Sequence, residues 1–253
     1  MMHSPDGFPV PLIRIRETNS TNLYLNHLCN ETVQAEFTTV ISRYQTAGRG
    51  QRGNSWESED GKNLLFSFVL YPGFLEAKRQ FLLSQIISLA IKETLDVYTN
   101  DISIKWPNDI YWKDKKICGM LIEHNLAGSY IERSIAGIGI NINQQQFFSP
   151  APNPVSLWQI TGKEENPVEI ASDIMQRVQE YYRLLRQDAV EQIGVRYQKS
   201  LFRRNGLHSY KDAEGEFKAT ILRVEPEGRL ILKDENGKER GYMFKEVEFR
   251  FTD

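Results

Sequence analysis

The sequence predicts an α+β fold in residues 1–204, followed by a small all-β unit in residues 205–253. Short apolar segments typical of buried strands occur beside two long segments with helical spacing, and the two kinds do not alternate strictly. This order favours a mixed sheet with packed helices over a doubly wound parallel sheet. From Asn205 onward only short strand-like segments remain, separated by turns such as Asn236-Gly237. We therefore expect the domain boundary between residues 204 and 205.

The expected elements follow from local composition and spacing. Five short segments, the first of them rich in β-branched residues, are expected strands of the larger domain: 37–44, 64–70, 102–106, 116–123 and 130–143. Two segments, 74–98 and 167–201, are expected to be long helices; in the first, Leu82, Ile86 and Leu89 recur at steps of four and three. In the tail, the expected strands are 216–224, 229–233 and 242–251.

Composition excludes several classes of protein. The chain has 253 residues, 40% of them apolar, and its 31 basic residues nearly balance 33 acidic ones, which argues against a globally basic nucleic-acid binder. Cys29 and Cys118 are too few for a disulfide framework, and four scattered histidines suggest no zinc cluster. No apolar run reaches the roughly 18 residues of a membrane span, and the N-terminus has no apolar signal core. The sequence therefore predicts a soluble, cytoplasmic protein.

A loop with three glycines is the most unusual segment. Gly48, Gly50 and Gly53 match the spacing G-x-G-x-x-G, but turn residues follow, where the dinucleotide fingerprint requires a helix. Asn54 stands where a Walker A loop has its lysine. Between positions 42 and 55 the loop carries three arginines and no acidic residue: Arg43, Arg49 and Arg52. Such a loop suits a phosphate or carboxylate, and the alternative is a solvated hairpin tip.

The segment 105–109, Lys-Trp-Pro-Asn-Asp, passes from a strand into a turn. Lys105 could place an ammonium beside phosphates, and Asp109 a carboxylate near Mg²⁺. The alternative is an ordinary Pro-Asn-Asp turn in which Asp109 bonds its own backbone.

Two further segments have both a structural and a functional interpretation. Gly137 and Gly139 interrupt an apolar strand, which indicates a close approach by a ligand or by a packed helix. On that strand Asn141 and Asn143 share one face, which favours ligand contact. Residues 17–22 are a plausible helix N-terminus, with Thr18, Ser20 or Thr21 as the cap, but their hydroxyls and amides could also bind a small polar head group.

Taken in order, these segments resemble the catalytic domain of biotin protein ligases. The matching motifs are Ser20-Thr21-Asn22, Gln45-x-x-Gly48-Arg49-Gly50, Lys105-Trp106-Pro107-Asn108-Asp109, Lys116 with Gly119, and Gly137-x-Gly139-Ile140-Asn141. The resemblance covers about residues 13–200, and the tail is similar to the family's C-terminal SH3-like domain. It implies a fold related to class II synthetase catalytic domains. It also implies an enzyme that activates biotin with ATP as biotinyl-5′-AMP and transfers it to a lysine of a biotin-carrier domain.

The resemblance also implies a role for each matched residue. Lys116, bridging the biotin carboxyl and the α-phosphate, is the expected catalytic residue together with Arg49. The residues expected to bind biotin are Ser20, Thr21, Asn22, Gln45, Gly48, Arg49, Gly50, Gln51, Lys116 and Gly119. Those expected to serve the nucleotide are Arg52, Trp56, Lys105, Asn108, Asp109 and Asn141, with Asp109 near Mg²⁺ and Trp158 as a candidate cover for the adenine.

Two departures from the family pattern bear on these roles. Gln51 and Asn54 stand where the family loop usually has arginines, so retention of the adenylate is expected to be weaker unless Arg52 compensates. Only about sixteen residues precede Thr18, too few for the DNA-binding domain of some members, and the tail has nine basic against eleven acidic residues. No DNA binding is therefore expected, and a homodimer is possible.

Two other functions remain open. A lipoate–protein ligase shares the fold and the adenylation chemistry, whereas a non-catalytic biotin or nucleotide sensor would act through a partner. The combination of Lys105-Trp106-Pro107-Asn108-Asp109 with Gly48-Arg49-Gly50 favours biotin, and the ureido-suited cluster at residues 20–22 agrees.

Overall fold

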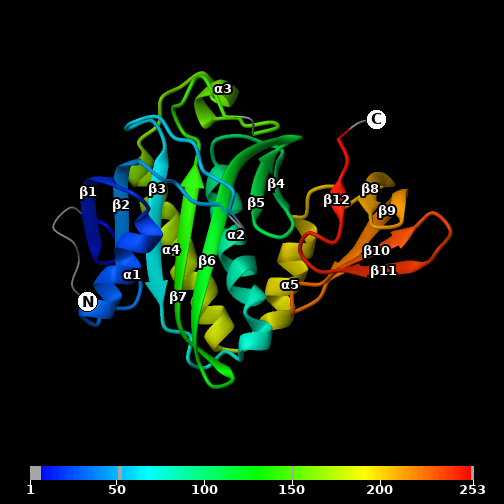
Figure 1. Cartoon of the computed structure of the whole chain (residues 1–253), viewed down its shortest axis with the longest axis horizontal. Helices are drawn as coiled ribbons and strands as arrows, with labels where there is room; N and C mark the ends of the chain where they lie inside the picture. The colour runs from blue at the N-terminus through cyan, green and yellow to red at the C-terminus, as the bar shows by residue number, and fades with distance from the viewer. Residues whose placement is uncertain (1–6, 51–52, 150, 252–253) are drawn as a thin grey trace.

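Two β-sheets organise the chain in the computed structural model, which describes residues 7–50, 53–149 and 151–251 (Figure 1). The strands of the larger sheet are β1 (Leu12–Thr18), β2 (Thr39–Gln45), β3 (Leu64–Leu70), β4 (Ile102–Lys105), β5 (Asp109–Trp112), β6 (Lys115–Ala127) and β7 (Tyr130–Ile140). Their order across the sheet is β1-β2-β3-β7-β6-β5-β4. Only β1 and β2 pair in parallel, and the other neighbours are antiparallel. The expected mixed sheet is therefore confirmed.

Helices cover both faces of the larger sheet. They are α1 (Thr21–Glu31), α2 (Phe81–Leu95), α3 (Leu157–Thr161), α4 (Pro167–Arg186) and α5 (Val190–Lys199), with a 3₁₀ turn η2 at Ala77–Arg79. The long helices α2 and α4 lie behind the sheet, and α1 lies in front of β2, β3 and β7 (Figure 1). Because β3 is sandwiched between the two helical layers, all seven of its residues are buried.

The tail forms the second sheet, in which every pairing is antiparallel. Its strands are β8 (His208–Asp212), β9 (Gly215–Val224), β10 (Leu230–Asp234), β11 (Glu239–Tyr242) and β12 (Glu248–Phe249), in the order β11-β10-β9-β8-β12. Trp106 Nε1 donates a hydrogen bond of 2.9 Å to the Gly228 carbonyl, which joins the two parts. Phe202, Phe249 and Phe251 stack beside Tyr111 at the same junction.

The structure differs from the expected elements in several places. The segment 167–201 is two helices, because Asp188 adopts a left-handed backbone (φ 55°) that ends α4. The expected strand 242–251 shares only Tyr242 with β11, whose other residues were not predicted, and otherwise contains only the two-residue β12. The strands β1, β5 and β8 were not predicted. Helix α1 begins at Thr21, and Ser20 occupies the N-cap position without a side-chain capping bond. Within the described residues, no helix is long and apolar enough to cross a membrane.

Candidate active site

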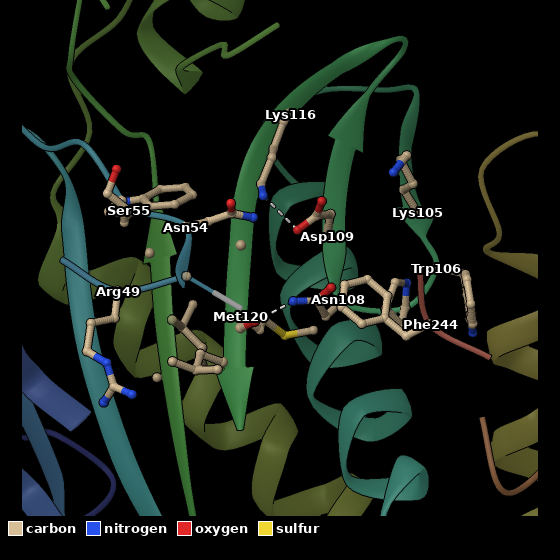
Figure 2. Close-up of a pocket in the computed structure, with 18 of the residues that line it drawn as sticks. Arg49, Asn54, Ser55, Lys105, Trp106, Asn108, Asp109, Lys116, Met120 and Phe244 are labelled. Carbon is tan, nitrogen blue, oxygen red and sulfur yellow. Dashed lines mark hydrogen bonds and ion pairs between the residues drawn. The ribbon is translucent and has the colours of Figure 1, made fainter. Parts of the chain in front are cut away.

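A cavity of about 620 Å³ lies on the front face of the larger sheet, where β4–β7 meet the tail (Figure 2). The sequence-predicted residues that line it are Ser20, Thr21, Asn22, Gln45, Arg49, Gly50, Trp56, Lys105, Asn108, Asp109, Lys116 and Gly119. Gly48 and Asn141 lie outside this lining set. Gln51 and Arg52, which the sequence also singled out, fall outside the described residues.

The N-terminus of α1 forms a hydrogen-bonded, uncharged end of the cavity. Thr21 donates from its backbone N–H (2.8 Å) and from its hydroxyl (3.1 Å) to Gln45 Oε1. Ser67 Oγ, on β3, lies 2.7 Å from both Thr21 Oγ1 and Asn22 Oδ1. These side chains come from a helix start and two strands that are adjacent only in the folded chain. The cluster at residues 20–22 is thus more than a helix cap, and Ser67 is a member that no motif revealed.

Asn22 explains one of the strand glycines. Its amide donates to the Leu121 carbonyl (3.1 Å) and to Glu123 Oε2 (2.9 Å) on β6. A Cβ at Gly137 on β7 would overlap Asn22 Oδ1. Because Asn22 lies on helix α1 and its side chain rests directly on the β7 backbone, glycine at 137 reflects the close approach of this packed helix.

Trp56 explains the other strand glycines. A Cβ at Gly139 would lie 2.5 Å from Trp56 Cε2, and one at Gly119 would lie 3.0 Å from Trp56 Cζ3, so the indole rests flat on β6 and β7. Its Nε1 is buried and has no hydrogen-bond partner among the described groups. A buried unpaired donor in a cavity indicates a place for a polar ligand atom.

The glycine loop is a hairpin and not a helix start. The Trp56 N–H donates to the Gly48 carbonyl (2.9 Å) and the Gly50 N–H to the Asn54 carbonyl (2.7 Å). Arg49 extends from this hairpin and forms an ion pair of 3.1 Å with Glu123 Oε1. Glu123 therefore joins the loop to Asn22, and so links the glycine loop to the uncharged end of the cavity.

The opposite end of the cavity is cationic. Lys116 Nζ lies 2.8 Å from Asp109 Oδ1 (Figure 2), and the Lys116 side chain is still 33% exposed. Asn108 donates to the Met120 carbonyl at 2.5 Å, which fixes the turn before β5. Asp109 of the 105–109 segment thus pairs with Lys116.

Lys105 lies where the tail closes on the cavity. Its ammonium is 5.4 Å from the ring centroid of Tyr111 on β5 and 4.8 Å from that of Phe249 on β12. Burial lowers the pKa of Lys105, and the nearby charges of Lys116 and Arg203 lower it further, against the opposing effect of Asp109. Lys105 therefore lies in a weakly solvated, positive environment.

Several lining residues were missed by sequence reasoning because they come from the tail: Phe244, Lys245, Val247, Glu248, Phe249 and Phe251. Strand β12 has two residues, too short for a periodic signal.

Glu57 is another residue that the sequence did not single out. Its carboxylate accepts from the backbone N–H groups of Phe148 (2.8 Å) and Ser149 (2.7 Å), and so ties the segment after Trp56 to the loop that follows β7.

Asn141 is a buried residue that joins β7 to the segment before α3. It is 3% exposed, and its amide donates to the Val155 carbonyl at 3.1 Å. Its carbonyl accepts from the Leu157 N–H at the start of α3, the helix that contains Trp158. The predicted contact of Asn141 with the nucleotide remains a prediction.

The cavity offers little to hold a metal ion by protein ligands alone. Among the described residues, no group of three His, Cys, Asp or Glu side chains could enclose one. Asp109 supplies one carboxylate, which fits Mg²⁺ as it arrives with a nucleotide, because that ion is held largely by phosphate oxygens and water.

Comparisons with known proteins agree on one family. Residues 13–141 match the family model described as biotin/lipoate A/B protein ligase. The bifunctional ligase/repressor BirA of Bacillus subtilis is 28% identical over 230 residues, 88% of this chain and 70% of that protein. A biotin–[acetyl-CoA-carboxylase] ligase of Paracoccus denitrificans is 33% identical over 139 residues, 51% of this chain and 56% of that protein. The structure of the Aquifex aeolicus biotin protein ligase, in complex with biotin and ATP, superposes with a TM-score of 0.78 at 25% identity, over 95% of this chain and 98% of that one.

Proposed function

The chain belongs to the biotin/lipoate A/B protein ligase family, and from this premise we propose that it is an ATP-dependent biotin–protein ligase. It activates biotin as biotinyl-5′-AMP and transfers the biotinyl group to a lysine of a biotin-carrier domain of a carboxylase. The match to a biotin ligase that binds biotin and ATP, over nearly the full length of both chains, supports this choice.

The observation that carries the proposal is the division of one cavity into an uncharged end and a cationic end. Thr21, Asn22 and Gln45 offer a neutral hydrogen-bonding site suited to the ureido head of biotin. Lys105 and Lys116 at the other end suit the carboxylate and the phosphates. A molecule with a polar neutral head and an anionic tail fits this arrangement.

In the first half-reaction a carboxylate oxygen of biotin attacks the α-phosphorus of ATP. The bond from that phosphorus to the bridging oxygen breaks, and pyrophosphate leaves. Lys116 lies between the two anions and lowers their mutual repulsion as they meet, so no side-chain nucleophile is needed. To do this, Lys116 exchanges its contact with Asp109 for the substrate oxygens. Mg²⁺ bound with ATP would neutralise phosphate charge, with Asp109 as the protein ligand.

In the second half-reaction the neutral amine of the acceptor lysine attacks the carbonyl carbon of the anhydride. The bond from that carbon to the AMP oxygen breaks, AMP leaves, and the proton of the amine passes to solvent. Trp56, resting on Gly119 and Gly139, covers the floor of the cavity and limits the access of water to the anhydride. Asn54 lines the cavity without the charge of an arginine, and we keep the prediction of weaker adenylate retention.

A single assay separates the candidate functions. We expect biotin, but not lipoate, to support exchange of labelled pyrophosphate into ATP, and we expect transfer of biotin to a purified carrier domain. Exchange with lipoate alone would assign the chain to the lipoate branch of the family. Absence of exchange and of transfer with both acids would refute the enzyme assignment and favour a sensor.

A further inference from the structure

A second, open hollow of about 760 Å³ adjoins the cavity, and its charge is predominantly positive. We call it the basic groove and define it by Lys115, Lys199, Arg203 and Arg204. It lies where the β5–β6 turn, the end of α5 and the start of β8 meet. Asp114 is the one acidic residue among the described residues that line it.

Three of its cations are available to a partner. Lys115, Lys199 and Arg204 are exposed, and none forms an ion pair with a described residue. Arg203 has a different role: it donates to the Arg250 carbonyl (2.6 Å) and stacks on Phe202 and Phe251, so it supports the wall of the groove. Phe251, which lines the groove, is an exposed apolar side chain (44%), and Leu207 (53% exposed) directly precedes the lining residue His208 in the chain.

The basic groove is continuous with the cavity. Phe251 lines both, and Lys115 and Asn153 of the groove directly neighbour Lys116 and Pro152 of the cavity in the chain. The Lys116 N–H donates to the Asn153 carbonyl at 2.8 Å, so the two rims are hydrogen-bonded together.

We infer that the basic groove docks an acidic face of the acceptor protein and so presents the acceptor lysine to the cavity. This inference rests on the proposed function, because the second half-reaction requires a folded protein to bring an amine to the neighbourhood of Lys116. Any such protein must cover part of the cavity rim, and the groove occupies that rim. Complementary charge steers association and sets orientation.

The surface suits an acidic protein better than a nucleic acid. Exposed apolar side chains beside a few cations are typical of a protein interface. The whole chain has a net charge of −2, so the surface outside the groove does not attract the phosphates of a nucleic-acid strand.

The test is a triple charge reversal, Lys115→Glu/Lys199→Glu/Arg204→Glu, in the full chain. We expect the KM for a purified biotin-carrier domain to rise about tenfold or more, while biotin-dependent pyrophosphate exchange stays at the wild-type rate. The matched control, Arg16→Glu/Lys163→Glu/Arg183→Glu, changes exposed cations outside the basic groove by the same total charge and should leave both values unchanged. In the wild type, the KM for the carrier domain should also rise with salt.

Other outcomes would overturn the inference. An unchanged KM in the triple variant, or an equal rise in the control, would exclude specific docking in the groove. Loss of exchange in a folded triple variant would assign the groove to the first half-reaction. Groove-dependent retardation of an RNA or DNA oligonucleotide, with carrier KM unchanged, would identify a nucleic-acid surface. If the wild type shows no exchange at all, the proposed function itself fails, and this result is distinct from the others.

Discussion

Replacing Gly137 by alanine should displace Asn22 and weaken biotin binding. The new Cβ would overlap Asn22 Oδ1 and lie 2.7 Å from Asn22 Cγ. The amide is held at one end by Ser67 (2.7 Å) and at the other by the Leu121 carbonyl (3.1 Å) and Glu123 (2.9 Å). Because these bonds fix both ends of the amide, it is unable to rotate away without losing them.

The size of the effect follows from those three hydrogen bonds. At about 0.5–1.5 kcal/mol each, their loss lowers the free energy of unfolding by about 1.5–4.5 kcal/mol, of which the preference for alanine over glycine in a strand returns roughly 0.5–1 kcal/mol. Loss of one hydrogen bond from the displaced Asn22 to biotin, at about 0.5–1.5 kcal/mol, corresponds to a rise of roughly two- to tenfold in the KM for biotin.

The assay is biotin-dependent pyrophosphate exchange, with unfolding in urea measured in parallel. The control is Gly194→Ala on α5, where an added Cβ meets no atom within 4 Å. This control should raise stability by up to about 1 kcal/mol and leave the KM for biotin unchanged. A Gly137→Ala variant with wild-type KM would refute the argument that Asn22 is held in place for biotin.

Three further predictions concern the cationic end, the domain junction and the half-buried His124. Lys116→Ala should lower the pyrophosphate exchange rate about 10²–10³-fold while the chain stays folded, whereas Lys115→Ala should keep the wild-type rate; equal rates in the two variants would contradict the role of Lys116. Trp106→Phe removes the bond to the Gly228 carbonyl and should lower the free energy of unfolding by about 1–3 kcal/mol, measured in urea; an unchanged midpoint would show that this bond does not hold the junction. Burial lowers the pKa of His124 to about 4 from 6.5, so its contribution to stability is present above pH 6.5 and is lost as the pH falls toward 4. This loss is about 2 kcal/mol between pH 7 and pH 5, and it should disappear in His124→Gln; the same pH dependence in both proteins would count against it.

Residue patterns predicted correctly the strands and helices whose residues are buried in the same way along their length. The segment Leu64–Leu70 is apolar except for Ser67 because β3 is buried on both faces, and its boundaries were predicted correctly. Edge strand β1 was missed, since its alternating Leu12–Thr18 pattern includes charged residues. The long helical segment was not predicted to divide, because the left-handed backbone at Asp188 leaves no strong mark in the residue pattern.

The sequence by itself determined the fold class and the motif residues of the cavity, because each motif is a run of neighbours whose chemistry is visible locally. Only the tertiary structure decided what those residues contact. It placed Asn22 on Gly137, Trp56 on Gly119 and Gly139, and Phe249 of the tail against Lys105. It also assembled the basic groove from separate segments. These contacts join residues far apart in the chain, and they depend on strand order and side-chain direction, which a local pattern does not encode.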